Sequence, residues 1–352
     1  MPAHQYTTIL EAATHAPSGD NSQPWCFRIE GDDIAVYHRK GQDKSLYDFK
    51  QRGSYIAHGA LIENILIASG SYGCHGEVET FPGEADCTAK ITFTRVPQRE
   101  DPLAPFITIR TTNRKPYDNK PLSQEQREEL TESVKAFPGV SFTMKEEKAD
   151  IAALAHAVSL NEQLVMENRT LHDCLFSVIR WSKQEERSTS GIYIKTMELP
   201  APAIPVFKIA RFWQCLRLLN LLGFSKTARK RNAKKYAASS GIGALILTSS
   251  EDTEYLNAGR AFQRLWLTAT KLGLSIQPIT AIPYLAMFLS DGDNATVFSE
   301  EHRACIMDEY RTITDIFAVA PKQHVAMLFR IGFGGEPSAH SYKLPPLILN
   351  AS

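Results

Sequence analysis

The chain has 352 residues, of which 43% are hydrophobic and 22% charged, a composition typical of globular proteins rather than disordered, fibrous or membrane-embedded ones. This length exceeds the size at which one hydrophobic core stops growing, so two packed lobes or a lobe with a large insertion are expected. Lysine plus arginine (39) equals aspartate plus glutamate (39), so no overall field draws the chain toward nucleic acid or an anionic membrane. Such a partner would need a local basic patch.

The six cysteines are scattered without a C-x-x-C pair, which favours a reducing compartment and predicts neither a disulfide framework nor a zinc site. The ten histidines form no H-E-x-x-H motif, so no metal site is predicted. Residues 1–16 lack the basic start, apolar stretch and cleavage site of an export signal, and we expect a cytoplasmic protein. The most membrane-like stretch, 203–224, is interrupted by Lys208, Arg211 and Arg217, which argues against a spanning helix.

The first region, residues 1–105, is predicted to be a small unit of helices and strands that ends in a proline-rich boundary. Helical spacing and strand-like alternation of apolar residues predict two helices and two strands, over 7–16, 33–37, 54–69 and 89–96.

The second region, residues 106–352, repeats a similar order at larger scale. Its patterns predict three helices and two buried strands, over 123–136, 151–165, 243–248, 252–272 and 325–331. Ser123 and Gln126 form a capping box at the start of the first of these helices. The segments 59–73 and 258–273 look like related helices that end in glycine, which favours an ancient duplication.

Residues 180–236 fit neither half and are interpreted as an insertion. An apolar, basic helix is predicted around 205–224. It is followed by six basic residues within ten positions that hold no acid: Lys226, Arg229, Lys230, Arg231, Lys234 and Lys235. Long excursions from a compact fold are often functional, so this segment is a candidate lid over a ligand. A solvated basic helix face is the alternative, and a membrane-surface or nucleic-acid contact is less favoured because no aromatic residues interleave with the charges.

Residues 16–27 (APSGDNSQPWCF) form a turn between a helix and an apolar strand. Its amides and the Ser18, Asn21 and Gln23 side chains could contact the edge of a heterocycle, while Pro17 and Gly19 shape the turn. An ordinary helix-to-strand turn needs the same residue types.

Residues 107–117 (ITIRTTNRKPY) place Arg110, Arg114 and Lys115 around the hydroxyls of Thr111 and Thr112. Arginine forks, hydroxyls and free amides together favour a phosphate site through charge-assisted hydrogen bonds. A surface cluster of ion pairs is the alternative.

Taken together, the two segments resemble a known family. APSGDNSQPW is similar to the P-S-x-x-N-x-Q-P-W turn, and RTTNR to the R-x-[ST]-x-R motif, of the nitroreductase family of FMN flavoproteins. That family forms α+β homodimers that bind flavin at the interface, with the two motifs supplied by different subunits. Because both motifs lie in one chain here, in reversed order, the resemblance implies a fused pseudo-dimer with one complete flavin site and one that has decayed.

The implied fold is α+β and nitroreductase-like, with two similar lobes fused in one chain, central antiparallel sheets flanked by helices, and a helical lid-like insertion. The lobes would span 1–105 and 106–352, with the insertion at about 180–236. A monomeric pseudo-dimer is compatible with this arrangement, and further association stays open.

Two more segments extend the resemblance: GLSIQPIT (273–280), similar to the family segment beside the flavin ring, and SYKLPP (341–346), similar to the part that meets the phosphate. The family pattern therefore implies these FMN-binding residues: Pro17, Ser18, Gly19, Asn21, Gln23, Arg110, Thr111, Thr112, Arg114, Gln277, Pro278, Ile279, Thr280 and Lys343. Trp266 is interpreted as a core residue instead.

The implied activity is hydride transfer from NADH or NADPH through FMN to a small aromatic or quinone-like acceptor, with no protein side chain as acid or base. A non-catalytic protein that stores or sequesters FMN under the insertion is the alternative. A stress-related protein that acts through its basic patch is a third hypothesis. Neither nucleic acid nor a membrane span is among the predicted partners.

Overall fold

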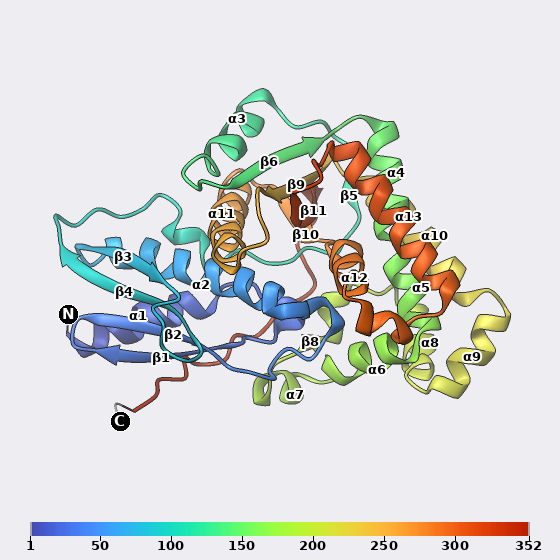
Figure 1. The fold of residues 1–352 in the computed structure, drawn as a ribbon, viewed down its shortest axis with the longest axis horizontal. Coiled ribbons are helices and arrows are strands. Elements are labelled where there is room, and N and C mark those ends of the chain that lie inside the picture. The colour runs from blue at the N-terminus through green and yellow to red at the C-terminus, as the bar shows by residue number, and fades with distance from the viewer. Residues whose placement is uncertain (1, 351–352) are drawn as a thin grey trace.

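The computed structural model describes residues 2–350. Its N-terminal part, up to about residue 105 and here termed the first half, forms a four-stranded antiparallel sheet packed on two helices (Figure 1). The strand order is β1-β2-β4-β3. The elements are α1 (Ala3–Thr14), β1 (Trp25–Glu30), β2 (Asp33–His38), α2 (Arg52–Gly70), β3 (Cys74–Thr80) and β4 (Cys87–Arg95). The helices and strands predicted for this half are confirmed to within a few residues, whereas β3 has no counterpart among the predictions.

The second half is built on a larger antiparallel sheet with the strand order β10-β11-β9-β6, to which β5 adds through β11. The strands are β5 (Tyr117–Asp118), β6 (Val140–Lys145), β9 (Gly241–Leu247), β10 (Ser275–Pro278) and β11 (His324–Gly334). The accompanying helices are α3 (Gln124–Glu132), α4 (Lys148–Val158), α5 (Leu160–Glu167), α11 (Asp252–Lys271), α12 (Ala281–Leu289) and α13 (Glu300–Phe317).

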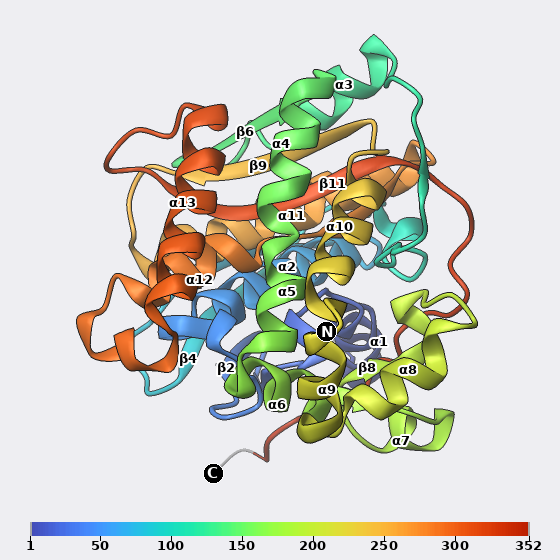
Figure 2. The same ribbon diagram turned by 90° about the vertical axis from the view of Figure 1, so that its right-hand side faces the viewer.

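Helices cover both faces of this larger sheet, as Figure 2 shows. Along β9, Ile242, Ala244 and Ile246 belong to one core cluster with α4, α12 and α13, whereas Leu245 and Leu247 belong to another with α11. This alternation follows from the two-residue period of a strand. The predicted α+β class, with antiparallel sheets flanked by helices, is confirmed.

The two halves meet where α2 crosses α11. A Cβ atom on Gly59 would lie 1.9 Å from the Leu256 carbonyl oxygen, and one on Gly259 would lie 2.0 Å from the Ile56 carbonyl oxygen. Only glycine permits backbones to approach this closely. The two glycines stand at equivalent positions of the segments 59–73 and 258–273, so the helices with related sequences are also the helices that join the halves.

The insertion consists of short helices at one corner of the molecule, at the lower right of Figure 1. Within the predicted range 180–236 they are α7 (Lys183–Ser188), α8 (Ala203–Ala210), α9 (Trp213–Leu221) and α10 (Phe224–Tyr236), with β8 (Ile192–Tyr193). Helix α6 (Arg169–Val178) and strand β7 (Ile179–Arg180), which pairs with β8, lead into this range. The continuous helix predicted around 205–224 is wrong, because the chain breaks between α8 and α9. Among residues 2–350, no helix is both long and apolar enough to cross a membrane.

Two further expectations are corrected. The helix predicted over 151–165 is two helices, because the chain turns at Ser159 between α4 and α5. Helices α12 and α13 were not predicted. The capping box is confirmed: the Ser123 hydroxyl accepts from the Gln126 amide, and the Gln126 side chain accepts from the Ser123 amide.

Residues 344–349 return to the first sheet. The Phe27 amide donates to the Leu347 carbonyl at 2.9 Å, and the Leu349 amide donates to the Phe27 carbonyl at 2.7 Å. The end of the second half thus extends β1 and crosses the boundary predicted at residue 105. That boundary stays a prediction.

Candidate cofactor site

The turn after α1 and the segment 107–114 lie against each other, although they are far apart in the sequence. The Arg110 guanidinium donates to the His15 carbonyl at 2.7 Å, and Thr112 forms a bridge with Ile276 of β10. Both segments line two adjoining cavities of about 350 and 120 Å³. The walls that the cavities share are Pro17, Ser18, Asp20, Thr112 and Arg114.

The turn has an unusual backbone that is held from several sides. Asp20, Asn21 and Gln23 all have positive φ, of 48°, 55° and 51°. Such conformations are costly for residues other than glycine and persist where their surroundings fix them. The Gln23 amide donates to the Ser18 hydroxyl at 3.0 Å, and the Asn21 side-chain amide donates to the carbonyls of Gly191 and Tyr342. The turn is therefore tied to both the insertion and the tail.

The smaller cavity contains two cations without a carboxylate partner, one buried and one partly buried. Arg110 is 7% exposed, its guanidinium lies over the Trp266 ring at 4.4 Å, and its Nε has no hydrogen-bond partner. The Lys343 ammonium donates to the Ala16 carbonyl and the Asn21 side-chain oxygen, at 2.8 and 2.9 Å. Within residues 2–350, neither cation forms an ion pair.

Burial disfavours the charge on both groups. It lowers the pKa of Arg110 to about 9, and burial with the nearby Arg110 charge lowers the pKa of Lys343 well below its usual value. A bound anion would offset this cost through charge-assisted hydrogen bonds. The cavity is also lined by His15, Thr108, Thr111, His340 and Ser341. This set of donors suits a phosphate group.

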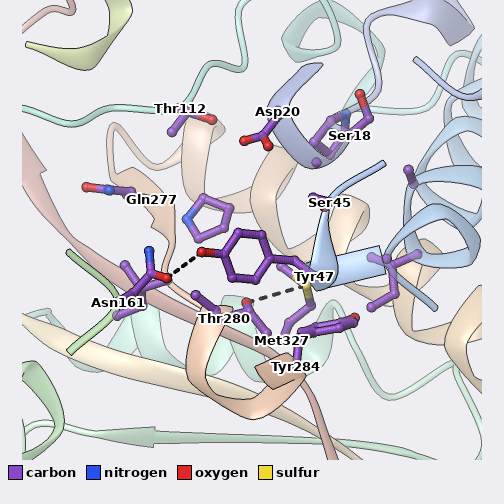
Figure 3. Close-up of a pocket in the computed structure, with 18 of the residues that line it drawn as sticks. Ser18, Asp20, Ser45, Tyr47, Thr112, Asn161, Gln277, Thr280, Tyr284 and Met327 are labelled. Atoms are coloured by element: carbon purple, nitrogen blue, oxygen red, sulfur yellow. Dashed lines mark hydrogen bonds between the residues drawn. The ribbon is translucent and has the colours of Figure 1, made fainter. Parts of the chain in front are cut away.

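The larger cavity has aromatic and aliphatic walls. They are formed by Tyr47, Ile56, Val158, Phe262, Trp266, Ile279 and Tyr284. Tyr47 occupies the centre of the view in Figure 3, and its hydroxyl donates to the Asn161 side-chain oxygen at 2.6 Å. Mostly apolar walls with a few fixed polar groups are typical of sites for flat organic ligands.

Polar groups lie along one edge of this larger cavity. The Arg330 guanidinium, fully buried, donates to the Gln277 side-chain oxygen at 2.9 Å and thereby fixes the direction of that amide. Asp20 also lines the cavity, and burial together with the neighbouring Asp43 raises its pKa to about 6. Burial likewise raises the pKa of Glu162, whose carboxylate accepts from the Tyr236 hydroxyl.

A third cavity, of about 800 Å³, lies beneath the insertion and adjoins the cavity of about 350 Å³ described above. The two cavities share these lining residues: Asp20, Tyr47, Arg114, Asn161, Glu162, Tyr236 and Gln277. We call the third cavity the chamber. Its remaining walls are largely apolar, including Leu171, Leu175, Met197, Leu199, Phe207 and Phe224. Four residues of its lining are exposed to solvent: Pro116, Pro200, and Thr227 and Arg231 of α10.

All of the residues predicted to bind FMN except Gln23 line one of the first two cavities. Gln23 lines neither, because its side-chain oxygen accepts from the Leu344 amide at 2.9 Å and so holds the tail. Trp266 is a core residue, as predicted, at 1% exposure, but it also forms a wall of the larger cavity.

Sequence reasoning missed Asp20, Tyr47, Asn161 and Glu162. Asp20 stands inside the recognised turn, at a position that the motif leaves open. Tyr47, Asn161 and Glu162 belong to segments without a motif, and only the tertiary fold brings them to the cavity. Among residues 2–350, no group of three histidine, cysteine, aspartate or glutamate side chains is arranged to hold a metal ion.

No family model matches the chain. An uncharacterised protein of Mycobacterium tuberculosis strain CDC 1551 is 24% identical over 340 residues, covering 95% of this chain and 46% of that protein. The chain thus spans about half the length of that relative. A protein of strain H37Rv named "Putative NAD(P)H nitroreductase Rv3131" is 25% identical, covering 79% and 76% of the two chains. Another, named "Putative NAD(P)H nitroreductase acg", is 28% identical and covers 50% and 56%.

Solved structures with partial similarity include a nitroreductase with bound FMN from Bacteroides fragilis, with TM-score 0.38 and 12% identity, covering 69% of this chain and 94% of that one. An iodotyrosine deiodinase bound to FMN and 3-iodo-L-tyrosine has TM-score 0.41 and 12% identity, covering 71% and 98%. Both TM-scores lie below 0.5.

The fold and the site define an α+β protein with a cleft that suits an aromatic ligand carrying a phosphate. The motifs and the sequence relatives agree: the chain is similar to proteins named as NAD(P)H nitroreductases. The resemblance stated from the two motifs is thereby confirmed.

Proposed function

We propose that the chain binds one FMN and acts as an oxidoreductase that passes a hydride from NADH or NADPH to a small aromatic or quinone-like acceptor. One observation carries the proposal: a pocket with two unpaired cations, buried Arg110 and partly buried Lys343, adjoins a cavity with aromatic walls. The NAD(P)H nitroreductase names of two sequence relatives also support it.

The donors present fit FMN. Arg110, Thr112, Arg114 and Lys343 would hold the phosphate, and the partnerless Nε of Arg110 is a buried donor that still needs an acceptor. Pro17, Ser18, Gly19 and Asn21 would contact the ring from one side, and the backbone from Gln277 to Thr280 would contact it from the other.

When bound, FMN supplies the redox chemistry, because its ring can accept a hydride and pass it on. The chain's own residues would bind and orient. Arg330 fixes Gln277, Asn161 fixes the Tyr47 hydroxyl, and the walls of the larger cavity exclude water from the reacting face. No side chain is assigned as a general acid or base.

The chamber provides room for a second ligand beside the cofactor. It adjoins the larger cavity and its volume of about 800 Å³ is ample for a small aromatic molecule. We place the acceptor there, with its apolar body against the insertion and its reacting end toward the shared residues.

The absorption spectrum of the purified protein tests this proposal. We expect a yellow protein that releases one FMN per polypeptide on heating and whose visible flavin absorbance is lost on anaerobic addition of NADPH or NADH. Stoichiometric flavin that stays coloured with both donors would favour the storage alternative. A colourless protein that does not bind added FMN would reject both.

A further inference from the structure

The insertion is unusually basic for a protein without net charge. From Leu199 to Ser250 the sequence contains no aspartate or glutamate, but it contains nine lysines and arginines. Most of that stretch forms α8, α9 and α10. A local positive field is therefore concentrated at one corner of the molecule.

The fold sorts the basic residues of α10 into two faces. Arg229 and Lys235 turn inward, where Arg229 pairs with Glu309 and Lys235 lies near Glu162. The outward face carries four exposed side chains at helical spacing, Lys226, Lys230, Arg231 and Lys234. Within the described chain, none of these four forms an ion pair. They are free to meet an external anion.

Exposed apolar side chains gather beside this basic face. Leu218, Leu221 and Leu222 are 66%, 83% and 86% exposed, and Ile209 and Phe212 are each about half exposed. Leu218 and Leu221 are three positions apart and so share one face of α9. Contiguous exposed apolar side chains on a protein surface mark a contact site more often than isolated ones do.

Basic residues also flank the apolar ones in the sequence. Lys208 and Arg211 are next to Ile209 and Phe212, and Arg217 is next to Leu218. Figure 2 shows α9 and α10 on the same side of the molecule, with α8 next to them. We define the docking face as the exposed residues of this corner: Lys208, Ile209, Arg211, Phe212, Arg217, Leu218, Leu221, Leu222, Lys226, Lys230, Arg231 and Lys234.

We propose that the docking face binds the surface of an anionic lipid bilayer. Bulky apolar side chains surrounded by lysine and arginine are the pattern of helices that lie in a membrane interface, with the apolar groups among the acyl chains and the cations at the lipid phosphates. Charge complementarity selects an anionic surface, because this face offers no acid. A nucleic acid would use the cations but would leave the exposed leucines without a role.

The other side of the same helices faces inward. Phe207 of α8, and Phe224 and Ala228 of α10, line the chamber, and Thr227 and Arg231 are two of its exposed lining residues. Docking through this face would bring Thr227 and Arg231 to the headgroup region, so that part of the chamber wall would lie beside the bilayer.

Vesicle co-sedimentation of the full chain tests the proposal. The probes are phosphatidylcholine vesicles with and without phosphatidylglycerol, at low and at raised salt. We expect binding only when phosphatidylglycerol is present, and weaker binding at raised salt. The variant L218Q/L221Q/L222Q and the variant K226Q/K230Q/K234Q should each lose at least about tenfold in apparent affinity.

The matched control is K44Q/K148Q/K322Q, which removes the same charge from exposed lysines elsewhere and should keep wild-type binding. Glutamine preserves helix propensity at exposed positions, and thermal unfolding will verify that all variants are folded. Absence of binding to phosphatidylglycerol vesicles would overturn the proposal. So would an equal loss in the control, or unchanged binding of the leucine variant, since either result would indicate a general attraction to polyanions.

Discussion

Two cavities flank the crossed helices α2 and α11, and they differ in whether carboxylates pair with the cations that line them. In the candidate cofactor site, Arg110 is buried and Lys343 is partly buried, and neither has a carboxylate partner. In the other cavity, of about 920 Å³, Arg260 pairs with Glu63 at 3.1 Å, and Arg264 pairs with Glu63 at 2.8 Å and with Asp101 at 2.5 Å. The chain itself neutralises Arg260 and Arg264 in the second cavity, whereas Arg110 and Lys343 in the first are left to a ligand.

The comparison teaches that volume is a poor guide to a binding site. The second cavity is the larger by volume, but its buried carboxylate, Glu63, is already paired with Arg260 and Arg264. Leu66 lines it from α2, and Trp266, at the corresponding position of α11, lines the candidate site instead. Corresponding helix positions thus line two different cavities, as expected if the chain descends from a protein with two ligand sites and has kept one. The ion pairs of Glu63 would then occupy the site that was lost.

The largest effect should come from separating the crossed helices. Replacing Gly59 with alanine places a Cβ within 1.9 Å of the Leu256 carbonyl oxygen, so the helices must move apart. We expect the free energy of unfolding to fall by about 3 kcal/mol or more, measured by chemical denaturation. Gly335→Ala is the control, because nothing lies within 4 Å of a Cβ there. Equal stability of the two variants would contradict the close crossing.

Breaking the internal ion pairs should come next. Glu63 is nearly fully buried, and Glu63→Gln removes the carboxylate that neutralises Arg260 and Arg264. We expect a loss of about 2 kcal/mol in the free energy of unfolding, less than for fully buried pairs because both arginines are partly exposed. The exposed pair of Glu129 with Lys271 provides the control, since Glu129→Gln should cost about 0.5 kcal/mol or less.

The two sets of arginines should differ in their effect on FMN. Arg110→Ala removes a charge-assisted contact worth about 1.5–3 kcal/mol, so FMN affinity should drop at least about tenfold, as measured by fluorescence titration. Arg264→Gln, in the other cavity, should leave FMN affinity unchanged. If the folded Arg110 variant bound FMN as tightly as the wild type, the phosphate would have to lie elsewhere.

The smallest effect concerns Asp20. Its pKa is raised to about 6 in the folded protein, above the ordinary value of about 3.9, so its contribution to stability is present below about pH 4 and is lost as pH rises through about 6. Without FMN, Asp20→Asn should therefore be more stable than the wild type by about 1–2 kcal/mol at alkaline pH, because Asp20 is only partly exposed.

This gain should disappear toward pH 4, where the wild-type carboxyl is protonated as well. Denaturation at pH values on both sides of about 6 measures it, and the exposed carboxylate of Asp308 provides the control variant Asp308→Asn. A gain of the same size across that range would show that Asp20 does not titrate in the way described.

Sequence patterns predicted much of this architecture because the relevant signals are local. The capping box at Ser123 and the apolar run of β9 need no tertiary information. The turn at 17–23 and the segment 110–114 also carry recognisable motifs, and their meeting at one cleft could be expected from the family resemblance.

Other features could not be predicted, because they depend on contacts through space. The break between α4 and α5 at Ser159 could not be predicted, because no glycine or proline stands there. The approach of Tyr47 to Asn161 joins segments over a hundred residues apart, and the sequence does not tell which arginines find a carboxylate and which do not. Likewise, the run of basic residues in α10 does not tell which of them face solvent and which face the protein interior.

The path of residues 343–349 has a consequence for synthesis. Lys343 holds the turn at Asn21, and Leu347 and Leu349 pair with Phe27 of β1. A nascent chain emerging from the ribosome would display its first sheet early, with that strand edge uncovered and the turn lacking its lysine. The turn and the first sheet are thus completed only after residues 343–349 have been made, and the cleft cannot take its full form before then.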